Sequence, residues 1–401
     1  MIQEIQLSRE QELRIQVEFG QQLMITLKTG TAEIFGAEMA SHRTYSFTGI
    51  SFPIFTWYGC TLQIQGEAKH YISNNSLMIS YLNIHSILQH KREISRENIN
   101  IRGPRVLIAG PIDSGKSSLC KILINYATRF GENPCFVDLD IGQGEITIPG
   151  TLSTTIVHEP IDIEEGFSLS NPLVYFYGNL TPTENTTLFS NLLNKITQSV
   201  NEKLQISQKS RSSGLIINTM GWVDGFGYSI LFKTITLFEV DYVLVLEIVL
   251  LEKPIGIKNR DSNFRRTTRF FRIQKYFYGA LNNFSPFVIS FDFQAFIFLK
   301  IFRVNPQQNQ NQTSEIYSQD PRFQIMEITP DQSLEYSICA VSFGKFEENQ
   351  NYDKNLVREE NVAGFLFVSK VEPETQTIWF LSPTQTQFPG NILLFDDLQW
   401  K

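Results

Sequence analysis

A two-residue alternation of hydrophobic and polar side chains runs through the first part of the chain. It is clear at residues 13–17 (LRIQV) and 23–27 (LMITL), and short apolar runs follow at 54–57 and 62–64. Because side chains of a β-strand point alternately to opposite faces, this period predicts strands that are buried on one side. Several short strands with turn residues between them favour a small β-sandwich over residues 1–100.

The pattern changes after this region, where short apolar runs alternate with stretches of helical period. A charged stretch at 86–99 predicts a helix or a linker before the change, and residues 183–204 predict an amphipathic helix beyond it. Strands that alternate with helices are typical of a parallel sheet covered by helices, which we expect over residues 101–303. The strands are predicted at 106–109, 135–137, 215–218 and 241–246.

The last part of the chain returns to a β pattern. Residues 304–320 are rich in Gln and Asn and predict a linker, and residues 321–401 predict a small β-rich domain. Within that domain, 364–370 and 376–382 are expected to pair as a hairpin, and 391–395 give one more strand. The chain is therefore predicted to be an α/β protein, with a central parallel sheet flanked by an N-terminal β-sandwich and a small β-rich C-terminal domain.

Composition and charge exclude several classes of protein. The 401 residues carry a net charge of −7, so no global basic field attracts nucleic acid. No apolar run approaches the roughly 20 residues that cross a bilayer, and the N-terminus lacks the features of a signal peptide, so we expect a soluble intracellular protein without a membrane partner. Free and mostly buried thiols are expected for the four widely spaced cysteines, Cys60, Cys120, Cys135 and Cys339.

The most specific chemical signal is the segment GPIDSGKS at residues 110–117, which matches G-x-x-x-x-G-K-[ST]. It follows a predicted strand and precedes an amphipathic stretch, the context in which this motif forms a phosphate-binding loop. Gly110 and Gly115 allow a tight turn that points backbone N–H groups at phosphate oxygens. Lys116 then reaches the β- and γ-phosphates, and the Ser117 hydroxyl ligates Mg²⁺. The motif predicts nucleotide binding in a phosphate-loop NTPase-type domain but does not specify a reaction.

Polar residues follow the predicted strands at the edge of a parallel sheet where ligands bind. Asp138 and Asp140 come after the strand at 135–137, in the sequence DLDIGQGE that also holds Gln143. One carboxylate could orient Mg²⁺ or its waters, and one could accept the proton of an attacking hydroxyl. The alternative is that both carboxylates only cap the end of the strand.

Two further features have both a functional and a structural interpretation. Trp222 follows the strand at 215–218 and could stack on a base or belong to the core. The segment 258–275 holds seven basic residues and one acidic residue, and it could be a lid over the γ-phosphate or a solvated basic helix. The arginines spaced to share one helical face are Arg265, Arg269 and Arg272.

Guanine is disfavoured as the base of the nucleotide. Recognition of GTP usually requires an N-K-x-D segment after a strand, whereas residues 194–197 read NKIT inside the predicted helix.

Short segments spread over nearly the whole chain, in order, are together more specific than the phosphate loop. They are ELRIQVE, TAEIFGAE, FTWYGC, GPRVLIAGPIDSGKSS, VDLDIGQGEITIPGT, EEGFS, PLVYFYGN, INTMGW, FRRTTR, YFYG and NILLF. With these segments the chain resembles the Clp family of polyribonucleotide 5′-hydroxyl kinases, a subunit of the pre-mRNA cleavage and polyadenylation machinery. The resemblance implies a nuclear protein with ATP and Mg²⁺ as cofactors. It also implies two partners, the 5′ end of an RNA and a helical, Pro-rich scaffold subunit of the same complex.

The resemblance also implies roles for particular residues. Lys116, Asp140 and Arg269 would be catalytic, with Asp140 as the general base and Arg269 as a lid arginine. Gln143 and Trp222 would contact the RNA. The nucleotide would be held by Glu12 and Ser51 near the adenine and by Asp113, Ser114, Gly115, Lys116, Ser117 and Ser118 around the phosphates. The residues expected at the metal from the motif and from the strand end are Ser117 and Asp138.

Four departures from the family pattern leave the activity open. Ser51 stands where the family has a lysine near the adenine, Gln274 replaces a second lid arginine, and Leu180 replaces a threonine. The connection after Leu246 also lacks a helix of ~18 residues. Two hypotheses therefore remain: an ATP-dependent RNA 5′-hydroxyl kinase acting in mRNA 3′-end processing, or a catalytically weak or inactive ATP-binding scaffold of the cleavage complex.

Overall fold

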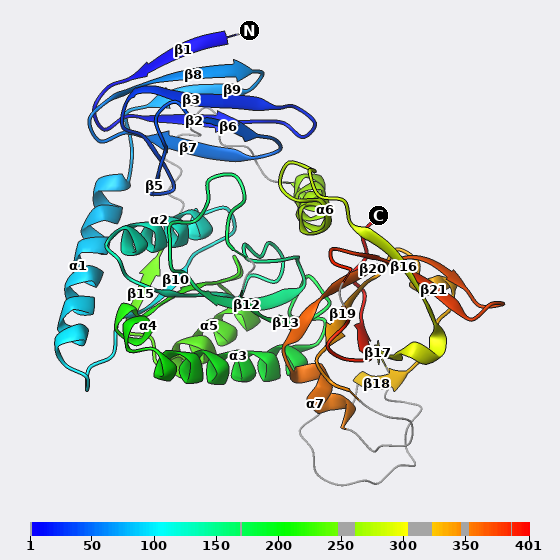
Figure 1. Ribbon diagram of the computed structural model, residues 1–401. Coiled ribbons are helices and arrows are strands. Elements are labelled where there is room, and N and C mark those ends of the chain that lie inside the picture. Colours follow the sequence, from blue (N-terminus) through cyan, green and yellow to red (C-terminus); the bar gives the residue numbers. More distant parts are fainter. Residues whose placement is uncertain (1, 169–170, 248–260, 304–322, 346–352, 386) are drawn as a thin grey trace. The chain divides into compact units, whose positions relative to one another are not determined.

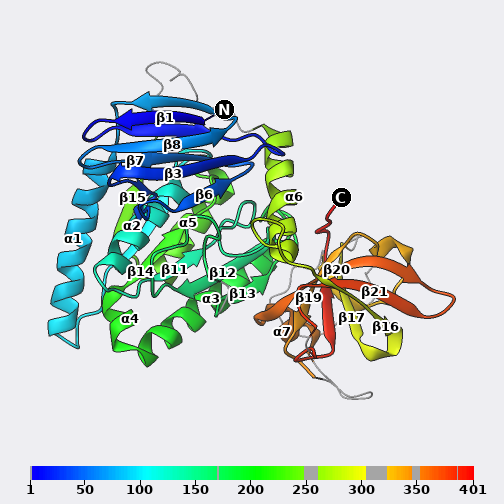
Figure 2. The ribbon, with the colours of Figure 1, turned by 45° about the horizontal axis from the view of Figure 1, so that its top comes forward.

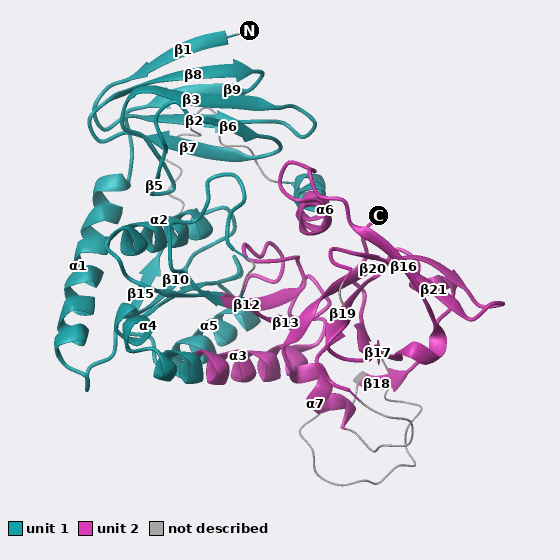
Figure 3. Cartoon of the chain, viewed as in Figure 1, with its two compact units in different colours: residues 1–137, 155–171, 201–268 teal, residues 138–154, 172–200, 269–401 magenta. Residues whose placement is uncertain are grey.

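In the computed structural model the chain forms two compact units (Figure 3). Unit 1 comprises residues 1–137, 155–171 and 201–268, and unit 2 comprises residues 138–154, 172–200 and 269–401. The predicted linker at 304–320 and the shortened connection that follows Leu246 at 248–260 lie outside the described residues. The described residues are 2–168, 171–247, 261–303, 323–345, 353–385 and 387–401.

The N-terminal part of unit 1 is the β-sandwich that the sequence predicts (Figure 2). In β2, Leu13 and Ile15 are buried in the hydrophobic core of the sandwich, while the polar residue after each of them is only half-buried. The predicted two-residue alternation therefore places the apolar side chains on the core side of the strand. One sheet holds, in spatial order, β1 (Ile2–Leu7), β8 (Cys60–Gly66), β3 (Leu23–Gly30) and β6 (Thr44–Phe47). The other holds β5 (Ala37–Glu38), β4 (Glu33–Ile34), β7 (Ser51–Phe55), β2 (Glu12–Gln16) and β9 (Lys69–Ser73).

The rest of unit 1 contains the strand that leads into the phosphate loop. That strand, β10 (Arg105–Ala109), pairs in parallel with two neighbours, which confirms the predicted parallel arrangement. All five of its residues are buried, as expected for a strand covered on both faces. The strands in spatial order are β11 (Cys135–Asp138, whose last residue belongs to unit 2), β14 (Leu215–Asn218), β10 (Arg105–Ala109) and β15 (Tyr242–Val245).

Helices account for most of the remaining chain in unit 1. The charged stretch at 86–99 is largely contained in α1 (Met78–Glu97), which lies alongside α2 (Figure 1). The face of α2 (Lys116–Arg129) that carries Leu119, Ile122 and Leu123 is buried, which confirms the predicted amphipathic helix after the loop. The other helices are α4 (Gln208–Ser213), α5 (Gly225–Leu237) and the first part of α6 (Ser262–Tyr278).

Unit 2 combines an antiparallel pair, a long helix and a seven-stranded sheet. The pair consists of β12 (Thr151–Ile156, of which Thr151–Thr154 lie in unit 2) and β13 (Leu173–Phe176). The helix predicted at 183–204 is α3 (Thr186–Ile206), whose residues up to 200 belong to unit 2. The predicted hairpin forms from β20 (Val362–Glu372) and β21 (Thr377–Ser382), and the strand predicted at 391–395 is β22 (Ile392–Phe395). The sheet holds β16 (Phe287–Asp292), β21 (Thr377–Ser382), β20 (Val362–Glu372), β19 (Ile338–Ser342), β22 (Ile392–Phe395), β17 (Ile297–Arg303) and β18 (Phe323–Glu327) in this order.

This sheet is buried on both of its faces near the middle. In β19, Ile338 and Ala340 belong to one hydrophobic cluster, whereas Cys339 and Val341 belong to another. The first cluster also takes in Phe176 of β13 and Phe277 of α6, so it joins the antiparallel pair and the sheet into one unit. Short helical segments complete the unit at α7 (Lys354–Glu359), Phe293–Ala295 and Gln332–Leu334.

All four cysteines are buried and free, as the sequence analysis predicts. None of the helices in the described ranges combines the length and apolar character that crossing a membrane requires.

Candidate nucleotide-binding site

The loop between β10 and α2 has the backbone conformation that the motif predicts. Gly110, Asp113 and Gly115 have φ angles of 156°, 63° and 92°. The two glycines are needed for different reasons. A Cβ on Gly110 would collide with the Leu246 carbonyl oxygen, whereas a Cβ on Gly115 would meet no heavy atom within 4 Å and would only suffer the left-handed conformation. Asp113 adopts this conformation without a glycine, which Asp tolerates better than most residues.

Lys116 lies within this loop rather than in solvent. The residue is only 6% exposed, and its Nζ donates hydrogen bonds to the carbonyl oxygens of Gly110 (2.9 Å) and Pro111 (2.8 Å). The Ser114 hydroxyl is buried and makes no hydrogen bond to the described part of the chain. A buried ammonium beside an unsatisfied buried hydroxyl, at the N-terminus of a helix, is a donor set that fits a phosphate group.

The residue expected to ligate Mg²⁺ has a neighbour that the sequence analysis missed. Asn218, the last residue of β14, lies with Nδ2 3.5 Å from the Ser117 hydroxyl and is fully buried. A polar residue at the carboxyl end of the strand next to β10 was the available signal. Across the described residues, no three His, Cys, Asp or Glu side chains converge as a metal cage would. Mg²⁺ commonly uses one or two protein ligands together with substrate phosphates, so these residues fit it only as part of a nucleotide complex.

The basic segment contributes an arginine to the phosphate loop. Within unit 1, Arg265 Nη2 donates to Asp113 Oδ2 at 2.9 Å. The segment is helical from Ser262 onward, as α6, which confirms its predicted helical period. Arg269 and Arg272 lie in the part of α6 that belongs to unit 2, where Arg272 approaches Glu145 at 3.4 Å. The sequence analysis named Arg265 as one of three arginines on a face but gave it no partner.

The turn that carries Trp222 packs directly on the phosphate loop. The backbone at Gly221 approaches Ile112 so closely that a Cβ on Gly221 would lie 2.6 Å from the Ile112 Cα. Trp222 itself is half-buried, and its ring lies 5.8 Å from that of Phe226. Both interpretations of Trp222 thus retain a basis, because the side chain is neither fully in the core nor free of it.

Asp138, the last residue of β11, and Asp140 organise their own loop within unit 2. Asp138 accepts hydrogen bonds from the backbone N–H groups of Asp140 (3.1 Å) and Glu145. Asp140 Oδ1 accepts from the N–H groups of Gly142 and Gln143, both at 3.0 Å. The capping contacts of the structural interpretation therefore exist, and the catalytic and metal roles stay predictions.

The two residues expected near the adenine lie on adjacent strands of the sandwich, Glu12 on β2 and Ser51 on β7. Glu12 is 6% exposed, and its carboxylate accepts hydrogen bonds from Arg14 and from the Ser76 hydroxyl (2.8 Å). This carboxylate is therefore held by its neighbours within the domain. Its predicted role at the adenine stays a prediction.

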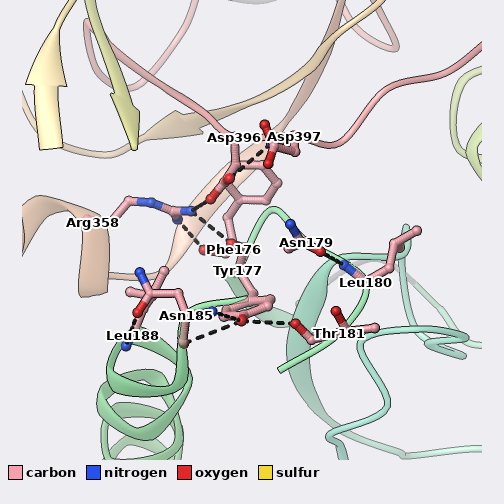
Figure 4. Close-up of polar contacts among 10 residues, drawn as sticks. All are labelled: Phe176, Tyr177, Asn179, Leu180, Thr181, Asn185, Leu188, Arg358, Asp396 and Asp397. Carbon is pink, nitrogen blue, oxygen red and sulfur yellow. Dashed lines mark hydrogen bonds and ion pairs between the residues drawn. The ribbon is translucent and has the colours of Figure 1, made fainter. Parts of the chain in front are cut away.

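A second polar site lies in unit 2, around the end of β13 (Figure 4). Arg358 of α7 is 1% exposed and donates to the carbonyl oxygens of Phe176 and Tyr177 and to Asp396 Oδ2 (3.1 Å). Burial raises the pKa of Asp396 to about 6, although the Arg358 guanidinium opposes this. Beside the pair is a cavity of about 250 Å³ lined by Tyr177, Asn179, Glu184, Asn185, Lys300, Ile301, Phe302, Asp396 and Asp397.

Comparison with known families accounts for most of the chain. Residues 110–249 match the mRNA cleavage and polyadenylation factor CLP1 P-loop. Residues 6–95 match the N-terminal beta-sandwich domain of polyadenylation factor, and residues 284–401 match the pre-mRNA cleavage complex II protein Clp1. The chain belongs to the Clp1 family.

Relatives of the Clp1 family match the chain from end to end. The polyribonucleotide 5′-hydroxyl-kinase Clp1 of Gallus gallus is 36% identical, and the match covers 100% of this chain and 96% of the relative. The human protein of the same name is 35% identical, and the protein CLP1 homolog of Anopheles gambiae is 38% identical. Each of these two matches covers 98% of this chain and 96% of the relative. This confirms the family resemblance that the sequence analysis states.

Solved Clp1 structures share the fold. The complex of wild-type Clp1p with a Pcf11p segment has a TM-score of 0.83 at 23% identity, covering 100% of this chain and 98% of that one. A second structure, which concerns an extended Pcf11p–Clp1p interface and ATP loss in a point mutant, has a TM-score of 0.82 at 22% identity and covers 100% and 99%. These likenesses show the fold alone.

Two of the departures from the Clp1 pattern can be located in unit 2. Gln274 lies in α6, with Oε1 buried and without a hydrogen bond to the described residues. Leu180 is partly buried against the cluster that covers the seven-stranded sheet, as an apolar residue favours. Neither side chain therefore offers the positive charge or hydroxyl that the family pattern places there.

Proposed function

We propose that this chain is an ATP-dependent RNA 5′-hydroxyl kinase of the Clp1 type that acts in pre-mRNA cleavage and polyadenylation. The observation that carries the proposal is the phosphate loop itself. Its backbone turns through three positive φ angles, Lys116 is buried in it, and the Ser114 hydroxyl lacks a partner among the described residues. The whole-length relatives named polyribonucleotide 5′-hydroxyl-kinase give this phosphate site its substrate class.

Each residue of the proposed site would have a defined role in the transfer of the phosphoryl group. Bound ATP would supply the γ-phosphoryl group, and Mg²⁺ would offset its negative charge. Lys116 and Arg269 would neutralise charge on the transferring group, and Asp140 would accept the proton of the RNA 5′-hydroxyl. Ser117 and Asp138 would hold the metal. The residues that would bind the rest of both substrates are Glu12 and Ser51 at the adenine, Asp113 to Ser118 at the phosphates, and Gln143 and Trp222 at the RNA.

The cellular setting follows from the same relatives. Family descriptions name the pre-mRNA cleavage complex, and solved Clp1p structures contain Pcf11p. We therefore place the protein in the nucleus, bound to a scaffold subunit of that complex and to RNA 5′ ends.

The test is transfer of labelled phosphate from ATP to an RNA oligonucleotide with a 5′-hydroxyl. Wild type is expected to label the RNA, and Lys116→Ala is expected to lower the rate at least about a hundredfold, because charge stabilisation in the transition state is lost. Lys121→Ala, five residues further along α2 and over the Phe35 ring, is the matched control and should retain the rate. Equal labelling by wild type and Lys116→Ala would show that the activity comes from a contaminant.

The alternative function, an ATP-binding scaffold with little or no turnover, is favoured by one specific observation. Gln274 stands where the family pattern has a second lid arginine, and its amide, of which Oε1 is buried, carries no charge to offer a phosphate. In this case the purified protein would retain intact ATP, and added ATP would raise its melting temperature by mass action without labelling RNA.

A further inference from the structure

An acidic side chain stands inside the phosphate loop. Asp113 lies two residues before Gly115, with φ at 63°, and its side chain is 29% exposed. A carboxylate in a loop that binds polyphosphate repels its ligand unless its charge is offset. The structure supplies that offset from a residue 152 positions away, because Arg265 Nη2 donates to Asp113 Oδ2 at 2.9 Å.

Contacts of the residues just before Arg265 hold its part of α6 in place. The preceding Phe264 ring lies 5.7 Å from the Phe19 ring of the N-terminal sandwich. Asp261 Oδ1 accepts a hydrogen bond from the Phe264 N–H at 2.7 Å, which caps the first turn of the helix. The arginine is therefore supported by the same unit that holds the loop, and its side chain is 25% exposed.

The guanidinium of Arg265 has donors beyond the one that Asp113 uses. Its Nε is buried and makes no hydrogen bond to the described residues. Arginine carries its positive charge on the whole planar fork, so the guanidinium offsets the Asp113 carboxylate whether or not its other donors are used.

We propose that Arg265 is a positioning residue for the phosphate loop, which neutralises Asp113 so that the loop accepts a nucleoside triphosphate. The inference rests on the proposed nucleotide binding and adds a residue that acts through Asp113. In this arrangement Asp113 secures α6 to the loop, and Arg265 removes the repulsion that the carboxylate would otherwise exert on the phosphates. Affinity for ATP then depends on Arg265 chiefly when Asp113 is present.

The test is a double-mutant cycle on the Kd of ATP, measured by calorimetry on the full chain. Arg265→Gln should weaken binding about tenfold, because the Asp113 carboxylate loses the positive charge of Arg265. Asp113→Asn, which keeps a residue that tolerates the left-handed conformation, should tighten binding. The double variant should regain most of the affinity that Arg265→Gln loses. Arg266→Gln removes an exposed neighbouring charge and is the matched control for general electrostatics.

Any of four results would overturn the proposal. Equal weakening in Arg265→Gln and in the double variant would show that Arg265 acts on the phosphates directly or supports the fold. No weakening in Arg265→Gln, or the same weakening in Arg266→Gln, would show that the ion pair has no effect on the loop. A wild-type protein that binds no ATP would refute the proposed function first, and the role of Arg265 with it.

Discussion

The clearest prediction on the stability of unit 2 concerns Arg358. Its guanidinium is fully buried and makes three charge-assisted hydrogen bonds, to the carbonyl oxygens of Phe176 and Tyr177 and to the carboxylate of Asp396 (Figure 4). Arg358→Met fills a similar volume but removes all three. Asp396, whose side chain is 11% exposed, is then left without its cation.

The magnitude follows from burial. Removing one partner of a buried ion pair costs about 3–5 kcal/mol, because the remaining charge has no compensation. A domain is stable by roughly 5–15 kcal/mol in total, so Arg358→Met should remove a large part of the stability of unit 2. Arg358→Met combined with Asp396→Asn removes both charges. The double variant should therefore recover about half of the loss, the remainder being the two carbonyl groups left unsatisfied.

Hydrogen exchange measured by mass spectrometry is the appropriate assay, because it reports local opening free energies in a protein of several domains. Peptides that cover β13 and β22 should exchange faster in Arg358→Met and regain protection in the double variant. Arg9→Ala breaks an exposed pair with Glu10 and should change no peptide in unit 2. A loss below about 1 kcal/mol, or a double variant no better than the single one, would refute the assignment of the cost to the uncompensated carboxylate.

Two further predictions use matched or internal controls. Gly178→Ala should destabilise unit 2 by more than about 3 kcal/mol, because φ is 80° and a Cβ would lie 2.9 Å from the Asp396 Cγ. The control Gly131→Ala has a similar φ of 77° but open space around the Cβ, so it should cost only about 1 kcal/mol. Urea unfolding measures both free energies. Burial, reinforced by nearby arginines, lowers the pKa of His85 to about 4, so the stability that depends on its neutral form is present above pH 6.5 and is lost as pH falls toward 4. Wild type should lose up to about 3 kcal/mol over this range that His85→Leu does not lose, and parallel pH profiles of unfolding would contradict the prediction.

The success of the sequence analysis in the core has a physical cause. The strands at 106–109, 135–137 and 215–218 are short apolar runs because both of their faces are covered, and such runs are visible without a structure. Of the antiparallel pair, β13 reads LVYF and offered an apolar run that the sequence analysis did not assign to a strand, whereas β12 was missed for the opposite reason. β12 reads TLSTTI. All four of its polar residues are buried, but because they carry hydroxyl groups the strand does not show up as an apolar run.

The same limit applies to the polar contacts of the site. The phosphate loop is a local motif, so its turn and its lysine can be predicted from eight residues, and its helix from the apolar spacing of the residues that follow. The ion pair between Arg265 and Asp113 joins positions 152 residues apart, and the buried Arg358 bonds residues more than 180 positions away. A single sequence ranks arginine as an exposed residue and carries no signal for its partner.

Asp138 and Asp140 show why the structural and the catalytic interpretation of a residue need not compete. A carboxylate has two oxygens with about four acceptor sites. Asp140 uses Oδ1 for the N–H groups of Gly142 and Gln143, and these bonds fix the orientation of the group within its own loop. A general base must be held in a defined orientation to accept a proton in the transition state, so the backbone contacts are a means of positioning it. The capping that the sequence analysis weighed against catalysis is therefore a condition that a catalytic aspartate at this position would have to meet.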